Sequence, residues 1–192
     1  MGAWSAEVTK QIEMALAQVG PLKIEIKSDR ELTTAERGQT DDCLRQAFWG
    51  LIDYHYQWSE ADWHVMEYAD GILVSYLAIV ERLGAVNEQP VKLGGIGAVA
   101  TLPEWRGRGL ASVAMEKAAD FMDDELGVEF GLLLCDQSTL PFYRRLGWEL
   151  VPGPLVFDQP GGKVTFPDLT MVLPFATRIW PQGTIDLRGL PW

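Results

Sequence analysis

The chain has 192 residues, of which 47% are hydrophobic, and this is enough to build one domain with a sizeable core. Its 27 acidic residues outnumber its 16 basic ones, and the formal net charge of -11 disfavours nucleic acids and anionic membrane surfaces as partners. Cationic small molecules or basic peptides suit this charge better. We therefore expect a single domain over residues 1–192, with no nucleic-acid and no membrane partner.

Targeting signals and metal motifs are not apparent in the sequence. No N-terminal signal peptide is indicated, and no run approaches the ~18 apolar residues that a membrane span needs. A cytoplasmic location is the expectation that follows. Cys43 and Cys135 lie far apart and lack the spacing of a metal site, so both are expected to be buried free thiols and no metal site is predicted.

The first third of the chain shows helical and strand patterns in turn. Apolar residues at helical spacing predict a peripheral amphipathic helix within residues 1–20, and residues 22–27 alternate apolar with charged side chains as a half-buried strand does. A second helix is expected within 28–50. The aromatic-rich stretch 51–63 has no clean period, which indicates a loop or short helix over a pocket.

Three strands are predicted next, at residues 64–68, 72–80 and 91–101. Asp70-Gly71 forms a tight turn of the type that hairpins favour, and residues 84–90 are expected to form a second turn. Sequential strands joined by turns make an antiparallel meander.

The second half alternates helices with strands. After Pro103 the apolar period changes from two to 3.6, which predicts a helix packed on a sheet and ending near Gly127. Residues 129–135 suit a central strand, and 139–146 a short helix. The tail over 152–192 is expected to add strands and loops to the same domain. This order predicts an α/β (α+β) fold with a mixed sheet flanked by helices.

The segment from Arg106 to Ser112 carries the clearest functional signal. A strand that runs through Arg-Gly-Arg-Gly into a helix places free backbone N–H groups at a helix N-terminus, a point that binds phosphate. Gly107 and Gly109 let the backbone approach an anion closely, and the two arginines add positive charge. The pattern matches neither the Rossmann fingerprint nor the P-loop. A turn with a solvated helix cap is the alternative interpretation.

This run resembles the signature Gln/Arg-x-x-Gly-x-Gly/Ala of the GNAT family of N-acetyltransferases, with Arg106, Gly109 and Ala111 on its defined positions. The resemblance implies a centrally splayed sheet, acetyl-CoA as the cosubstrate, and a loop that holds the pyrophosphate of coenzyme A. It also implies that Val99 and Thr101 bind the pantetheine arm through their backbone. The cofactor-binding residues so implied are Val99, Thr101, Arg106, Gly107, Arg108, Gly109, Leu110, Ala111 and Ser112.

Three glycines, Gly94, Gly95 and Gly97, lie in the strand before the loop. Glycine inside a strand marks either a bulge or tight packing, and the sequence leaves both open. A bulge would suit a strand that splays from its neighbour.

Downstream, residues 140–148 resemble the second GNAT motif, in which a tyrosine on a short helix faces the thioester sulfur. Tyr143 occupies that position, and the resemblance implies that it is the general acid for the departing thiolate. The backbone N–H of Val99 would polarise the thioester carbonyl. An ordinary core tyrosine is the alternative. The general base is left open among three residues near the first meander strand: Glu60, Asp62 and His64.

The layout over 43–192 also resembles the aminoglycoside 2'-N-acetyltransferases, whose acceptor pocket uses several carboxylates. Here Asp62 matches one pocket acid, whereas Gln57 and Gly97 stand where acids are expected. We therefore expect direct acetyl transfer to a primary amine of a small molecule that is not necessarily an aminoglycoside. The substrate-binding residues so expected are Gln57, Asp62, Gly97 and Trp192.

Two other functions remain open from the sequence. One is an aminoglycoside 2'-N-acetyltransferase proper. The other is a module that binds acyl-CoA without catalysis, as a sensor or partner subunit. A homodimer is open as well.

Overall fold

The structure, a computed structural model, describes residues 10, 21–48 and 56–192. The helix expected within 1–20 and the first part of the aromatic stretch lie outside these described residues. The strands are β1 (Leu22–Ser28), β2 (Trp63–Ala69), β3 (Ile72–Val86), β4 (Gln89–Thr101), β5 (Phe130–Cys135), β6 (Glu149–Leu150), β7 (Leu155–Gln159), β8 (Gly162–Thr165), β9 (Leu169–Pro174) and β10 (Ile185–Asp186). The helices are α2 (Thr34–Ala47), α3 (Leu110–Asp124) and α4 (Leu140–Arg145), with 3-10 turns η1 (Asp29–Glu31) and η2 (Pro103–Trp105).

All of these strands belong to one mixed sheet. Its main order is β6-β9-β5-β4-β3-β10-β7-β8, while β2 pairs with β3 and β1 pairs with β2. The predicted mixed α/β fold is confirmed. None of the helices in the described part of the chain is both long and apolar enough to cross a membrane.

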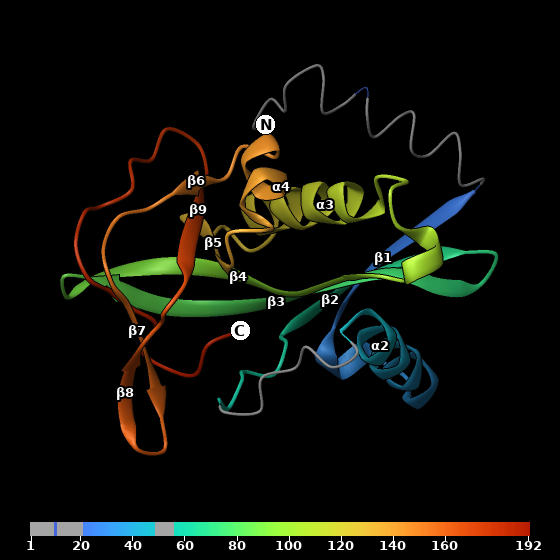
Figure 1. The fold of residues 1–192 in the computed structure, drawn as a ribbon, viewed down its shortest axis with the longest axis horizontal. Helices are drawn as coiled ribbons and strands as arrows, with labels where there is room; N and C mark the ends of the chain where they lie inside the picture. The colour runs from blue at the N-terminus through green and yellow to red at the C-terminus, as the bar shows by residue number, and fades with distance from the viewer. Residues whose placement is uncertain (1–9, 11–20, 49–55) are drawn as a thin grey trace.

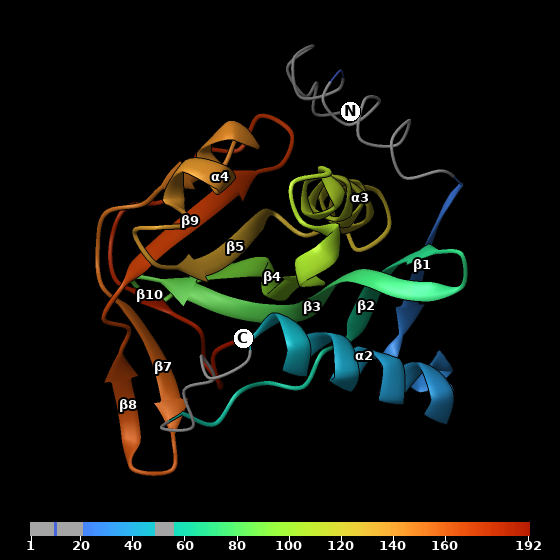
Figure 2. The same ribbon diagram turned by 45° about the vertical axis from the view of Figure 1, so that its right-hand side comes forward.

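Helices cover both faces of the sheet. Figures 1 and 2 show α3 and α4 on one face and α2 on the other. On the α3 face, Val65 and Leu77 pack with Val113 of α3, and on the α2 face Met66 packs with Cys43 of α2. Both cysteines of the chain are buried and free, as the sequence indicated. The central strands are therefore buried on two sides, which explains their nearly continuous apolar sequence.

The helix predicted within 28–50 begins at Thr34 because the residues before it form a capping box. Thr33 Oγ1 accepts the Glu36 N–H at 3.2 Å, and the Glu36 carboxylate accepts the Thr33 N–H at 2.9 Å. These two bonds satisfy backbone donors that a helix N-terminus leaves free. The residues before the cap form the separate turn η1.

The predicted meander is β2, β3 and β4, which pair antiparallel in sequence order. Its first turn is at Asp70-Gly71, where both residues have positive φ, as predicted for a tight hairpin. The tail returns to this sheet: β9 pairs antiparallel with β5, and β10 lies between β3 and β7.

The prediction of a turn over 84–90 is wrong in its boundaries. β3 continues through the start of this segment, and the turn consists of Asn87 and Glu88, both with positive φ. Gly84 is a strand residue whose small size serves packing. A Cβ there would lie 2.8 Å from Leu93 Cδ1 and 3.0 Å from the Asp186 carbonyl oxygen. Glycine at this position therefore reflects close packing and not a turn.

The indole of Trp192 contacts both central strands, β4 and β5. Its Nε1 donates to the Leu132 carbonyl at 3.2 Å, and its ring lies against β4 at Gly95. A Cβ on Gly95 would lie 2.1 Å from the ring, a distance that forces the indole or the strand to move.

We predict that Gly95→Ala destabilises the protein by about 1 to 3 kcal/mol, because the added methyl overpacks the contact with Trp192. Gly38→Ala in α2 is the control, since a Cβ there meets nothing within 4 Å and alanine should stabilise the helix by about 0.5 to 1 kcal/mol. Unfolding free energies from urea titration measure both. Equal stability of the two variants would contradict the packing argument.

Candidate active site

β4 and β5 part in the middle of the sheet. They pair in parallel only between Leu93–Ile96 and Phe130–Leu133, although β4 continues to Thr101 and β5 to Cys135. The ends of the two strands therefore diverge without a shared ladder. This is the central splay that the sequence resemblance implied.

A bulge in β4 lies where the splay begins. Tyr76 is opposite Ala100, while Ala78 is opposite Gly97, so β4 has one residue more than β3 over this interval. Ala98 within the bulge has a φ of 53°, a left-handed backbone conformation that residues other than glycine rarely adopt. The bulge thus falls on an alanine and not on a glycine.

The glycines of β4 are explained by packing. A Cβ on Gly94 would lie 2.3 Å from Met122 Sδ, on the α3 face. A Cβ on Gly97 would lie 2.8 Å from the backbone carbonyl carbon of Trp192, on the other face, where Gly95 also meets the indole. Of the two alternatives that the sequence left open, the structure supports tight packing.

The backbone of β4 after the bulge presents free groups toward β5. The N–H of Leu102 donates to the Val74 carbonyl of β3 at 3.0 Å. Because backbone groups alternate between the two edges of a strand, the amides of Val99 and Thr101 point to the opposite edge, toward β5. The Thr101 carbonyl accepts Nε–H of Arg106 at 3.1 Å, which connects this strand end to the loop that follows.

The loop between η2 and α3 leaves a helix N-terminus uncapped. Gly107 and Gly109 have φ of 74° and 80°, and a Cβ on Gly107 would meet nothing within 4 Å, so its conformation and not crowding calls for glycine. Within the described residues of α3, no side chain caps the N-terminus and the first turn contains no acidic residue. The amides of Leu110 and Ala111 there have no intrahelical acceptor, whereas Ser112 N–H already bonds to the Gly109 carbonyl.

Both arginines of the loop are tied to neighbouring backbone. Arg106 Nη2 donates to the Ala47 carbonyl at the end of α2, at 3.1 Å. Arg108 Nη2 donates to the Glu104 carbonyl at 3.2 Å, and its guanidinium lies 4.7 Å from the ring centroid of Trp105. The two side chains therefore hold the loop in shape and place positive charge beside the uncapped helix end.

Tyr143 lies on α4 and is 9% exposed. Burial raises the pKa of its hydroxyl above the ordinary value, and Cys135 and Asp136 nearby raise it further. The hydroxyl is therefore protonated at neutral pH, which is the state that a general acid needs. Asp136 also shapes the turn before α4, because its carboxylate accepts the N–H groups of Ser138 and Thr139 at 2.7 and 3.0 Å.

His64, one of the three base candidates, is buried in a polar network under α2. Its Nδ1 lies 2.8 Å from the Tyr76 hydroxyl, and its Nε2 lies 3.2 Å from Asp29 Oδ1. Burial lowers the pKa of His64 although Asp29 opposes this shift. Asp29 in turn forms an ion pair with Arg37 of α2. Sequence reasoning missed this network because nothing local connects Asp29 to His64.

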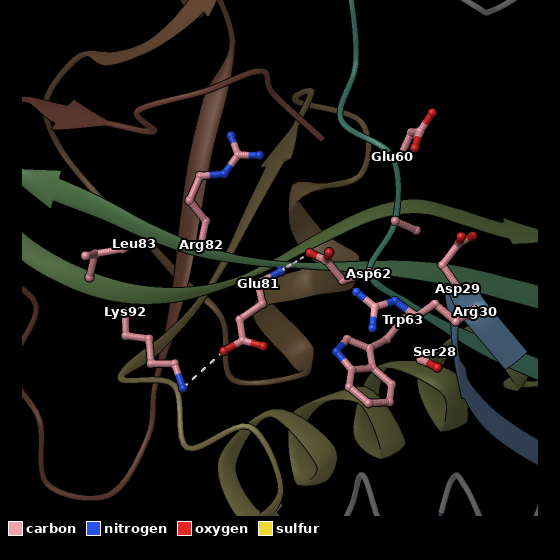
Figure 3. Close-up of a pocket in the computed structure, with 11 residues that line it drawn as sticks. Ser28, Asp29, Arg30, Glu60, Asp62, Trp63, Glu81, Arg82, Leu83 and Lys92 are labelled. Carbon is pink, nitrogen blue, oxygen red and sulfur yellow. Dashed lines mark hydrogen bonds and ion pairs between the residues drawn. The ribbon is translucent and has the colours of Figure 1, made fainter.

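The other two base candidates, Glu60 and Asp62, line a groove of about 880 Å³ at the edge of β3. Figure 3 shows their side chains with those of Glu81 and Trp63 around this groove. Asp62 Oδ2 accepts the Glu81 N–H at 2.8 Å and so satisfies an edge donor of β3. Neither Tyr143 nor any residue of the glycine loop is among the described residues that line the groove.

The four expected acceptor residues fall in three places. Asp62 lies at the groove, whereas Gly97 and Trp192 meet at the start of the splay. Gln57 is exposed and pairs through its backbone with the amide of Gln159 in β7, at 2.9 Å for both bonds. The structure therefore joins only Gly97 and Trp192 directly.

Arg82 connects two of these places, a role that the sequence did not indicate. Its guanidinium donates to the Leu190 carbonyl at 2.6 Å and to Ser59 Oγ at 2.9 Å, and it lies 5.6 Å from the Trp192 ring centroid. A Cβ on Gly189 would collide with it, at 2.3 Å from Nη1. Arg82 thus ties the loop that carries Asp62 to the C-terminal segment.

A splayed sheet with an uncapped helix N-terminus at its open end defines the acyl-CoA acetyltransferase type of fold. The family model described as "Acetyltransferase (GNAT) domain" matches residues 32–151. The chain belongs to this family.

Among curated proteins, the chain is similar to the aminoglycoside 2'-N-acetyltransferase of Mycolicibacterium fortuitum, with 27% identity over 117 residues. The match covers 57% of this chain and 59% of that protein, which is less than two thirds of the relative's length.

Solved structures share the fold. Escherichia coli YhbS, a GNAT family N-acetyltransferase in complex with CoA, matches with a TM-score of 0.59 and 18% identity over 90% of this chain and 97% of that one. A GNAT family acetyltransferase from Brucella melitensis in complex with acetyl-CoA matches with a TM-score of 0.57 and 15% identity over 85% and 94% of the two chains.

We predict that the His64 network weakens the fold at acidic pH. The pKa of His64 is lower in the folded protein than the value of 6.5 for the free side chain, so the unfolded chain binds more protons as the pH falls below about 6.5. Its share of the unfolding free energy is present at pH 7 and lost as the pH falls. Urea titrations at pH 7 and pH 5 measure this loss.

His64→Gln is the matched variant, because it keeps a polar side chain but does not titrate. The difference in unfolding free energy between wild type and variant should shrink from pH 7 to pH 5. A difference that stays constant or grows would contradict a neutral, buried histidine.

Proposed function

We propose that this chain transfers the acetyl group of acetyl-CoA to a primary amine of a small molecule by direct attack. The observation that carries the proposal is the parting of β4 from β5 immediately before a glycine loop at an uncapped helix N-terminus. Membership of the GNAT family supports it, as do the CoA and acetyl-CoA complexes of proteins that share the fold.

The glycine loop would hold the pyrophosphate of the cosubstrate. The amides of Gly109, Leu110 and Ala111 and the positive end of α3 suit an anion, and Arg106 and Arg108 add charge beside them. Gly107 and Gly109, which both have positive φ, leave this stretch of backbone without side chains that would block an anion. These residues fit the group that the family implies.

The free edge of β4 would bind the pantetheine arm. The amides of Val99 and Thr101 face the open side of the splay, where an extended chain with amide groups can continue the hydrogen bonding of the sheet. Thr101 also borders the loop through Arg106, so one ligand can occupy both positions.

Two groups of the chain would serve the chemistry. The amine nitrogen attacks the thioester carbonyl carbon, the C–S bond breaks, and the amine releases one proton to solvent water. The Val99 N–H would stabilise the oxygen that becomes negative, and the protonated hydroxyl of Tyr143 would supply the proton to the departing thiolate. No covalent enzyme intermediate is needed, so Cys135 has no role in this scheme.

The net charge of -11 suits a cationic acceptor. The groove itself has mixed charge, because the carboxylates of Asp29, Glu60, Asp62 and Glu81 and the basic side chains of Arg30, Arg82 and Lys92 all line it. Trp192 and Gly97 border the splay. An aminoglycoside is a second candidate acceptor, favoured by the similarity to the Mycolicibacterium fortuitum enzyme. Against it, Gln57 and Gly97 supply no charge where carboxylates would be needed.

A thiol-release assay tests the proposal. The protein is incubated with acetyl-CoA and a panel of primary amines that includes an aminoglycoside with a 2'-amine and its analogue without that amine, and products are identified by mass. Acetylation of any amine supports catalysis, and selective acetylation at the 2' position supports the aminoglycoside. Tight acetyl-CoA binding without turnover on the whole panel would favour a binding module.

We predict that Tyr143→Phe lowers kcat about 10²- to 10⁴-fold while the acetyl-CoA dissociation constant changes little, because only the proton donor is removed. Tyr68→Phe is the control, since that hydroxyl contacts Met66 on the α2 face. Equal kcat values for the two variants would exclude Tyr143 as the general acid.

We also predict that Gly107→Ala weakens acetyl-CoA binding about tenfold or more, because a side chain in the left-handed loop disturbs backbone bonds to phosphate. Gly71→Ala is a closely matched control: its φ of 79° is similar to the 74° of Gly107, and a Cβ meets nothing within 4 Å at either site. Both variants should lose similar stability, but only Gly107→Ala should lose affinity. Calorimetric titration with acetyl-CoA decides this.

A further inference from the structure

Glu67 is a buried carboxyl group that the proposed chemistry does not use. It lies in β2, has no solvent exposure, and both of its carboxylate oxygens are without a hydrogen-bond partner in the described structure. A charge in such a place is costly unless something compensates it. Its position therefore calls for an explanation.

The residues around Glu67 place it beneath the first turns of α3. Side chains two apart in a strand share a face, so Glu67 lies on the same face as Val65 and Ala69. Val65 packs in a cluster with Val113 of α3, and Ala69 packs in one with Leu110, the first residue of the helix. The carboxyl group thus lies on the face of the sheet that α3 covers, near the N-terminus of this helix. The glycine loop leads into the same helix end.

Two residues with hydroxyl side chains lie between Glu67 and that loop in the register of the sheet. Glu67 is directly opposite Ser75 in β3, and Ser75 is directly opposite Thr101 in β4. The Ser75 and Thr101 hydroxyl oxygens are 3.2 Å apart, and Arg106 binds the Thr101 carbonyl. The buried carboxyl is therefore separated from the cofactor loop by two side chains in one row across the sheet.

The neighbouring elements provide little opposite charge. In β1, Lys23 lies opposite Tyr68 and so faces the α2 side, where it pairs with Glu25. The buried residues of α3 are all apolar, and Arg106 and Arg108 bind backbone carbonyls on the loop side. Burial accordingly raises the pKa of Glu67 to about 8, and the nearby Ser75 hydroxyl, which donates to the Ala100 carbonyl at 3.0 Å, opposes this shift only in part.

We propose that Glu67 takes up a proton when acetyl-CoA binds, and that its ionised form weakens the binding of the cosubstrate phosphates. The proposal rests on the proposed cofactor loop. Two anions would then lie near the positive N-terminal end of α3: the buried Glu67 carboxylate and the pyrophosphate at the glycine loop. Their repulsion is strong because the protein interior has a low dielectric constant. Neutralising one of them by a proton removes their repulsion.

The sign of the pH dependence follows from linkage. In the free protein Glu67 ionises as the pH rises past its raised pKa of about 8. The bound phosphates raise that pKa further, so above this pH binding takes up a proton and affinity falls. Once the free protein is ionised and the complex is not, the fall is about tenfold per pH unit.

Calorimetric titration with acetyl-CoA at pH 7 and pH 9, in two buffers that differ in protonation enthalpy, tests the proposal. For the wild type we expect proton uptake at pH 9 and an affinity lower by about tenfold than at pH 7. Glu67→Gln, which mimics the protonated acid, should lose the uptake and keep most of its affinity at pH 9. Glu116→Gln is the control: the pKa of Glu116 is also raised by burial, but it lies further along α3.

The outcomes separate this proposal from the proposed function. If the wild type binds acetyl-CoA and Glu67→Gln retains the same proton uptake and pH dependence, the role of Glu67 is wrong and the cofactor loop stands. If no acetyl-CoA binds at any pH, both fail. Should Glu67→Gln not fold, the infrared carbonyl band of protonated carboxyl groups in the wild type decides: it should grow on adding acetyl-CoA at pH 9, and an unchanged band would overturn the proposal.

Discussion

The end of the ladder between β4 and β5 at Ile96 is the constraint on which the candidate site depends. Up to that residue the two strands satisfy each other's backbone groups, and beyond it they do not. The bulge at Ala98 changes the course of β4 at the same point. A strand edge inside a fold needs hydrogen-bond partners, and a ligand with amide groups can supply them. On the proposed function, the open edge of β4 and the loop at its end form one continuous surface for acetyl-CoA.

Where β4 and β5 still pair, the C-terminal segment packs against both strands. Trp192 fills the space that Gly95 and Gly97 leave over β4, and its indole N–H binds β5 through Leu132. Arg82 then secures the segment to the loop before β2. One aromatic ring therefore bridges the two strands on the side where they still pair. The tail thus packs against both strands where the splay begins.

The sequence predicted those features that depend on local patterns. The strand periods, the turn at Asp70-Gly71, the helix after the loop and the splay implied by the family motif are confirmed. The sequence did not predict the end of β3. Gly84 is needed because a side chain there would collide with Asp186, about a hundred residues away in the chain, and not because the chain turns. The network of His64 with Asp29 was missed for the same reason. Contacts between distant segments leave no period in the sequence.

The difference between local patterns and contacts of distant segments also separates the proposed cofactor site from the proposed acceptor site. The groups proposed to bind the cosubstrate come mainly from one stretch between Val99 and Ser112, so one motif predicts them together. The acceptor candidates come from the loop before β2, from β4 and from the C-terminus, and tertiary contacts such as those of Arg82 bring their segments together. On the proposed function, the choice of amine depends on how the tail and the loop before β2 pack, more than on any single motif.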